Sequence, residues 1–240
     1  MKYRNAILIV LLVIIADQFL KIYIKTHFAN GDDVKIMGSW FHLHFIENEG
    51  MAYGMKLSES VVGKLLLSSF RLIAVVFGFY LLGRLVKKNY GKGVIICGSL
   101  ILAGALGNLL DSVFYGLMFT DSPYSCFSGN YDSMHSMVQT HNQVAVAHLT
   151  SFGHGYGKFL QGKVVDMLYF PLLETRMPGW VPFMGGKNFI FFEPVFNIAD
   201  AAISVGVLTL VFFQKRLIHK PAEENLVQPK PEETTIADTK

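Results

Sequence analysis

Charged residues are scarce in this chain, and that scarcity excludes an ordinary soluble protein. Asp, Glu, Lys and Arg make up 16% of the 240 residues, whereas 52% are apolar or aromatic. A soluble domain carries about 25% charged residues, so the composition indicates several membrane spans. The net charge of +3, without a basic patch interleaved with stacking aromatics, gives no reason to expect a nucleic-acid partner.

Cysteine is equally scarce. The two cysteines exclude a disulfide framework and a C-x-x-C site, and the short motifs of nucleotide-binding proteins, zinc proteases and serine hydrolases are absent. Four histidines recur in one stretch, but their spacing is not that of a metal pair and no Cys or Glu ligand accompanies them. We therefore predict no metal and no cofactor, with zinc bound by these histidines as the alternative: His135, His141, His148 and His154.

Four apolar runs reach the roughly 20 residues that a membrane span needs. They cover residues 6–24, 65–85, 93–118 and 195–213. The first run has no small-residue cleavage site after it, so we expect it to remain as a span. Basic clusters at residues 2–4, 84–92 and 215–220 fall on one side if the chain crosses four times, and the positive-inside rule makes that side cytoplasmic.

The predicted fold class is a membrane all-α protein, a four-transmembrane-helix bundle with a small β-containing outer platform. Residues 25–64 form the first outer loop, in which residues 40–48 alternate like a strand. Residues 119–194 form an enlarged second outer loop. We divide the chain into a membrane domain, residues 1–220, and a cytoplasmic tail, residues 221–240, whose Pro-, Glu- and Lys-rich composition predicts disorder.

Polar side chains inside the spans share one depth. Counted from the predicted inner ends, Asp17, Asn108, Asp111 and Asp200 lie at heights of roughly 17–27 Å in a core about 30 Å thick. Solvated helix ends are the alternative explanation, but a single depth for three spans favours a shared polar site. Two carboxylates held close cannot both ionise, so such a pair can supply an acid and a base to activate water. Buried acids also serve proton or cation transport.

Five short blocks, taken in order, resemble lipoprotein signal peptidase, also called signal peptidase II. They are DQFLK (residues 17–21), NEGMAYG (48–54), GNLLDS (107–112), VVDM (164–167) and FNIAD (196–200). The resemblance covers all four spans. From its position outside the spans, Asp166 would be interpreted as a solvated loop acid. The resemblance instead implies that Asp166 and Asp200 are a catalytic aspartyl dyad. It assigns supporting or substrate-binding roles to seven further residues: Asp17, Lys21, Asn48, Gly50, Asn108, Asp111 and Asn197.

The resemblance also implies a function and a location. The function is an aspartyl endopeptidase that cleaves prolipoproteins before a diacylglyceryl-modified cysteine and is sensitive to globomycin. The location is the bacterial inner membrane, with both termini cytoplasmic, a periplasmic platform and a site at the outer leaflet. The partners are prolipoproteins and membrane lipids, and we expect a monomer. The alternatives are a proton-coupled carrier, which usually shows an internal repeat, and a scaffold that has lost activity.

Two features depart from the family pattern. The third block usually ends in arginine, and here Ser112 takes that place; Lys163, close to Asp166 in sequence, is one candidate for the missing cation. Arg71 and Lys64 lie early in the second span, and we expect both to reach the outer headgroups. The second loop is also enlarged, and because every block lies outside residues 119–160, we expect that stretch to be dispensable for chemistry.

Overall fold

Four long apolar helices form the body of the molecule. The computed structural model describes residues 1–48, 61–124, 146–176, 178–180 and 186–217. The helices are α1 (Tyr3–His27), α2 (Val61–Lys87), α3 (Lys92–Leu110) and α6 (Ile198–Leu217). Each is long and apolar enough to cross a membrane, which confirms the predicted bundle.

Helix α3 lies at the centre of the bundle. It contacts α1, α2 and α6, and it continues through a π-helical turn, η1 (Asp111–Tyr115), into the short α4 (Gly116–Met118). Small residues allow the close approach of α6. A Cβ atom added to Gly104 would lie 2.1 Å from the backbone oxygen of Ala199.

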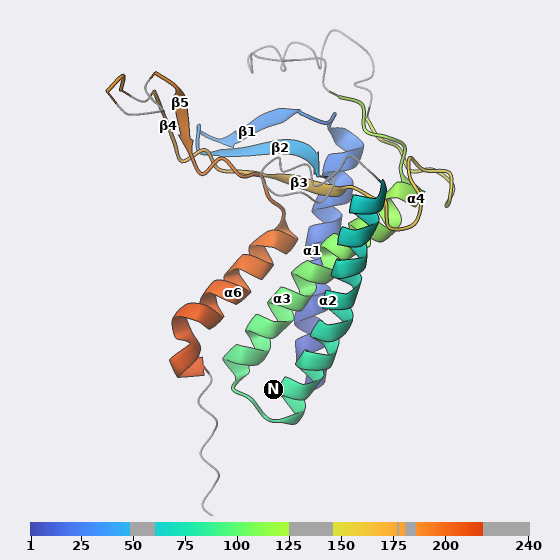
Figure 1. The fold of residues 1–240 in the computed structure, drawn as a ribbon, viewed down its shortest axis with the longest axis vertical. Coiled ribbons are helices and arrows are strands. Elements are labelled where there is room, and N and C mark those ends of the chain that lie inside the picture. The colour runs from blue at the N-terminus through green and yellow to red at the C-terminus, as the bar shows by residue number, and fades with distance from the viewer. Residues whose placement is uncertain (49–60, 125–145, 177, 181–185, 218–240) are drawn as a thin grey trace, which may run out of the picture.

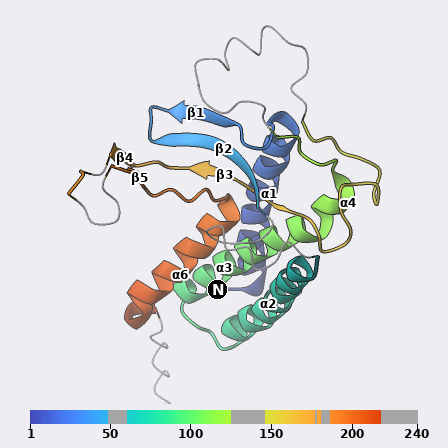
Figure 2. The same cartoon turned by 45° about the horizontal axis from the view of Figure 1, so that its top comes forward.

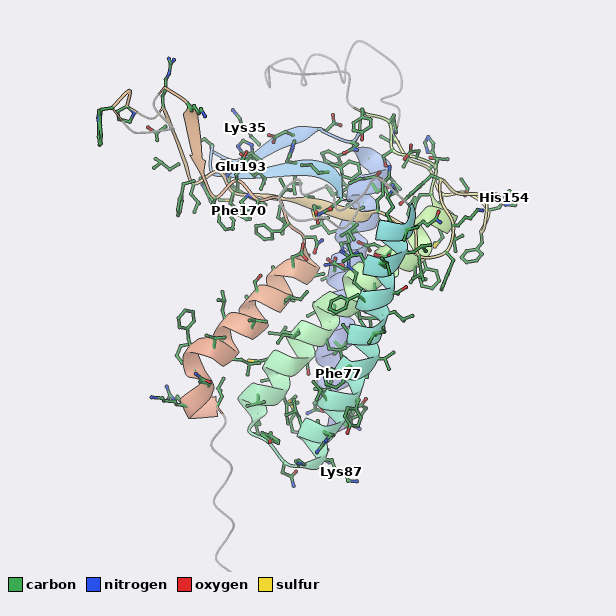
Figure 3. All side chains as sticks on the ribbon, in the orientation of Figure 1. Lys35, Phe77, Lys87, His154, Phe170 and Glu193 are labelled. Atoms are coloured by element: carbon green, nitrogen blue, oxygen red, sulfur yellow. The ribbon has the colours of Figure 1, made fainter. Side chains whose placement is uncertain are left out.

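The basic clusters gather at one end of the bundle, as the sequence predicts. The N-terminus, the α2–α3 connection and the end of α6 all lie opposite the sheet in Figure 1. Lys87 marks that end in Figure 3, and Phe77 projects outward from the side of α2. Large apolar side chains such as Phe19 and Ile73 are exposed along the helices, as expected where lipid is the solvent.

A small antiparallel sheet covers the other end (Figure 1). Its order is β1 (Asp33–Met37), β2 (Phe41–Asn48) and β3 (Val164–Tyr169). Strand β2 is the one that the alternating pattern predicts. Val165 and Met167 of β3 pack into a core with α1 and η1, and because side chains alternate along a strand, Asp166 points to the opposite face.

A second hairpin, β4 (Leu173–Arg176) with β5 (Asn188–Phe191), accounts for part of the enlarged loop. Figure 2 shows it beside the three-stranded sheet, on the side where the chain enters α6. Phe170 and Phe196 stack at 5.7 Å between ring centroids, and Phe170 stacks on Phe41 at 4.8 Å. This aromatic row joins the first sheet to the chain that enters α6.

Both described flanks of the second outer loop, residues 119–124 and 146–163, pack against the bundle. The N–H groups of Gly157 and Gly162 donate to the carbonyl groups of Gly116 and Ser112, at 2.8 and 2.9 Å. They thereby satisfy acceptors that the end of a helix leaves free. These flanks are part of the fold, so the predicted dispensability now applies to residues 125–145 alone, which lie outside the described residues.

A buried ion cluster ties the first flank to α1. The ammonium group of Lys25 pairs with Glu47 of β2 and donates to Ser122 at 2.9 Å. Lys163 lies 3.1 Å from the Glu47 carboxylate and 2.9 Å from that of Asp121. Because Lys25 is fully buried, losing Glu47 would leave its charge without compensation.

Several predictions concern residues that the structure does not describe. Gly50, His135, His141 and the tail at residues 221–240 are among them.

Candidate active site

Two carboxylates from different elements meet where α6 joins the sheet. Asp166 belongs to β3, and Asp200 belongs to the first turn of α6. Phe196 and Leu168 exchange two backbone hydrogen bonds of 2.7 and 3.0 Å, which hold the chain entering α6 against β3. Helix α6 therefore begins at Ile198, three residues after the predicted start of the span. This pairing brings Asp166 and Asp200 close enough for a direct electrostatic interaction.

Asn197 links the two acids. Its Oδ1 accepts the backbone N–H of Asp200 at 2.9 Å, as the N-cap of a helix does. Its Nδ2 donates to Oδ1 of Asp166 at 2.7 Å. The side chain is fully buried, so a lost partner would leave a buried amide unpaired. One residue thus both starts α6 and orients the carboxylate of β3.

Asn108 performs the matching task for Asp200. Its Nδ2 donates to Oδ1 of Asp200 at 2.7 Å. Its Oδ1 accepts hydrogen bonds from Lys21 at 2.8 Å and from Asn197 at 3.2 Å. Those two donors fix which end of the amide faces the acid, since the oxygen must point toward them.

A buried cation holds the rest of the polar layer together. The Lys21 ammonium lies 2.9 Å from Asp17 and 2.7 Å from Asp111, and all three side chains are at most 1% exposed. Asp17 also accepts the backbone N–H of Ala199 at 2.9 Å. The N–H of Ala199 is one of the donors that the first turn of α6 would otherwise leave free, and this bond gives it an acceptor. The negative charge of Asp17 also interacts favourably with the positive end of the α6 dipole.

Strand β2 contributes Asn48 to the site. Its Nδ2 donates to Oδ2 of Asp166 at 3.1 Å, so both carboxylate oxygens of Asp166 accept amide hydrogen bonds. Of the nine residues predicted for the site, the structure therefore brings together every one except Gly50, which lies outside the described residues. Their catalytic and supporting roles remain predictions.

The environment of Asp166 favours its protonated form. Its pKa is raised to about 7, first because burial removes water from the charged carboxylate and next because Asp200 carries the same charge. The hydrogen bonds from Asn48 and Asn197 oppose that rise. Near neutral pH this pair can therefore keep one proton, and a carboxylic acid beside a carboxylate can act as an acid and a base.

Arg71 of α2 joins the site, and the expectation that it reaches the headgroups was wrong. Its guanidinium donates to the hydroxyl of Ser112 at 2.8 Å, and it interacts electrostatically with Asp111, Asp166 and Asp200. Lys163 does not supply the missing cation, because its ammonium is held by Glu47 and Asp121.

Sequence reasoning also missed Gln18, whose amide donates to Asp111 at 2.8 Å. A signal existed for both residues. Gln18 lies inside the first block, next to Asp17. Counted from the inner end of its predicted span, Arg71 lies at a height of about 21 Å, within the range of the four polar residues.

The donors of this site do not form a metal centre. Among the described residues no three His, Cys, Asp or Glu side chains gather in a way that could hold a metal ion. Two acids of the polar layer, Asp17 and Asp111, instead pair with the ammonium of Lys21. Of the four histidines, His148 and His154 lie in the second flank, and the other two are outside the described residues.

Comparison with known proteins covers nearly the whole chain. The family model for signal peptidase (SPase) II matches residues 9–215. A lipoprotein signal peptidase of Porphyromonas gingivalis is 42% identical over 214 residues, which are 89% of this chain and 83% of the relative. One from Amoebophilus asiaticus is 32% identical, over 90% of this chain and 80% of the relative.

A solved structure has the same fold. It is described as a bacterial membrane enzyme determined by the in meso method, and it superposes with a TM-score of 0.50 at 23% identity. The superposition covers 92% of this chain and 94% of the other. Together, the matched family model, the relatives and the four-helix fold show that this multi-pass membrane protein belongs to the signal peptidase II family, a family of peptidases.

Proposed function

We propose that the protein is a membrane aspartyl endopeptidase that removes signal peptides from prolipoproteins by cleaving before the diacylglyceryl-modified cysteine. The observation that carries the proposal is the pair of Asp166, which is buried, and Asp200, which is partly buried. A network of amides orients both carboxylates. Membership of a peptidase family disfavours the proton-coupled carrier. The inert scaffold is disfavoured because the pair and its amide partners are all present.

The pair acts as one titrating unit. One carboxyl group keeps the shared proton and donates it in a hydrogen bond to the scissile carbonyl. The other carboxylate takes a proton from the attacking water, and the new C–O bond forms as the carbonyl π electrons move to the carbonyl oxygen. The tetrahedral intermediate then collapses, the C–N bond breaks, and the leaving amine takes a proton from the pair, which keeps one proton. The pKa of about 7 for Asp166 supports a pair that holds a single proton near neutral pH.

The position of the pair suits a lipid-modified substrate. The site lies at the sheet end of the helices (Figure 1), opposite all three basic clusters. With those clusters in the cytoplasm, the pair lies in the outer leaflet of the bacterial inner membrane. A diacylglyceryl chain anchored there positions the scissile bond, and binding energy from the lipid is converted into orientation. We expect a monomer that globomycin inhibits and that uses no metal.

The test is cleavage by the purified full-length chain. A synthetic prolipoprotein peptide with a diacylglyceryl-cysteine should be cut to leave that cysteine at the new N-terminus, as read by mass spectrometry. Asp166→Asn and Asp200→Asn should each lower turnover by about 100-fold or more. The double variant should be scarcely worse, because residues that act as a unit are not additive. Asp33→Asn, on the outer strand β1, is the matched control and should keep normal turnover.

Two results would overturn the aspartyl mechanism. One is near-normal turnover by folded Asp166→Asn. The other is loss of turnover in EDTA with recovery in zinc, which would favour the histidine-bound metal instead.

A further inference from the structure

One cation in the site has no place in the mechanism above. Arg71 lies in the body of α2, half-buried, and its Nη1 donates to Oγ of Ser112 at 2.8 Å. Ser112 is fully buried and donates onward to the backbone oxygen of Asn108 at 2.9 Å. Asn108 in turn holds Asp200. Three hydrogen bonds therefore separate the guanidinium from Asp200 of the dyad.

The balance of charges in the site indicates a role for Arg71. Four carboxylates lie in the polar layer, and Lys21 is the other cation among them. An ammonium has three N–H groups, and those of Lys21 face Asp17, Asp111 and Asn108. Lys21 is thus occupied by the two acids outside the dyad. Among the described residues, the hydrogen-bond partner of Arg71 is neutral Ser112, so its charge remains available to the dyad.

We propose that Arg71 is a positioning residue that keeps one negative charge on the Asp166/Asp200 pair at physiological pH, with Ser112 as the anchor of its guanidinium. Arg71 interacts electrostatically with Asp111 and, next, with Asp200 and Asp166, and the last two interactions support this role. The inference rests on the proposed aspartyl mechanism. It also accounts for Ser112: a small hydroxyl leaves room for a guanidinium that enters from the neighbouring helix.

The direction of the pH effect follows from the groups that face the pair. Besides Arg71, they are Asp17, Gln18 and Lys21 from α1, Asn48 from β2, Asn108 from α3, Asp111 from η1 and Asn197, the N-cap of α6. A nearby cation favours the ionised form of a carboxyl group. Without Arg71 the pKa of Asp166 rises further, so the pair takes its second proton at a higher pH and also releases its last proton at a higher pH.

The experiment is the pH dependence of kcat/KM between about pH 5 and pH 9. Arg71→Gln should shift both limbs of the profile upward by about one pH unit. On the acid side of the optimum it should therefore lower turnover about tenfold. Arg71→Lys keeps the charge, so its limbs should match those of the wild type even if its maximum is lower. Arg84→Gln is the matched control, since Arg84 lies on the same helix and donates to Tyr80 near the end opposite the sheet.

A merely structural role would lower turnover without moving either limb. Folded Arg71→Gln with unshifted limbs would therefore overturn the inference. If Arg71→Gln does not fold, the double variant Arg71→Ser, Ser112→Arg keeps one arginine at the same contact and should retain the wild-type limbs. If the double variant folds and the limbs of its pH profile are shifted, the inference is likewise overturned. The two proposals can be told apart. If Asp166→Asn loses turnover while the limbs of Arg71→Gln stay unshifted, the proposed function stands and only the role of Arg71 is rejected.

Discussion

At the scale of single residues, Asp166 makes the stability of the protein depend on pH. Its pKa is about 7 in the folded chain, against about 3.9 for an unperturbed Asp. Between these values the folded state keeps a proton that the unfolded state releases. The contribution of Asp166 is therefore fully present below about pH 4 and is lost as the pH rises through about 7.

We predict that the Tm of the wild type falls between about pH 5 and pH 8 and that Asp166→Asn flattens the fall. Thermal unfolding in one detergent at a series of pH values measures both slopes, with Glu193→Gln, which changes an exposed acid, as the control. Parallel slopes for the wild type and Asp166→Asn would show that Asp166 titrates as an ordinary surface acid.

The sequence predicts part of this site from physical reasoning alone. Depth within the spans identifies Asp17, Asn108, Asp111 and Asp200, because a charge in lipid needs a partner at its own height. Depth does not apply to Asp166, which lies outside the spans, so only the resemblance identifies it. Arg71 lies at the depth of the acids, but a long basic side chain in the outer part of a span is also typical of one that reaches the headgroups. Height also carries no information about direction around a helix, and direction decides whether a side chain meets lipid or the site.

At the scale of elements, the close contact of α3 with α6 determines where Asp200 lies. We predict that Gly104→Ala destabilises the protein by about 1–3 kcal/mol, the usual effect of overpacking. The new methyl group would lie 2.1 Å from the Ala199 oxygen, so the start of α6 must move. Asp200 directly follows Ala199, and turnover should therefore fall more than stability alone explains.

Gly83→Ala is the matched control for this contact. Gly83 lies on α2 with nothing within 4 Å of the added Cβ atom. Alanine is a better helix former by about 1 kcal/mol, so this variant should be as stable as the wild type or more so. Tm and turnover of both variants check the prediction, and equal behaviour of the two would contradict the tight α3–α6 contact.

The same elements show why boundaries were harder to predict than spans. Apolar length is a strong signal, and all four helices exist. Helix α1 extends beyond its apolar run to Tyr3 and His27, because a helix continues where its backbone hydrogen bonds continue. Helix α6 begins late because Phe196 pairs with Leu168 of β3. The π turn η1 has no signature in the local sequence, although π turns often occur at functional sites.

At the scale of the whole molecule, the arrangement predicts a topology. Lys87 and His154 are both exposed and lie at opposite ends of the bundle in Figure 3. With Cys97 and Cys126 replaced, a single cysteine at residue 154 should react with a membrane-impermeant thiol reagent applied to intact cells. A single cysteine at residue 87 should react only after the membrane is opened. The reverse pattern would invert the bundle and place the site in the inner leaflet.

The hydrogen bond between Asp17 and the first turn of α6 has a consequence for the order of assembly. It joins residues 182 positions apart, so it closes a loop of nearly the whole chain, and contacts of this separation form late in folding. The first span enters the membrane with its acid in place, but that acid has no helix to cap until the last span arrives. A chain whose last span has not yet been made therefore lacks the proposed dyad, because Asp200 belongs to that span.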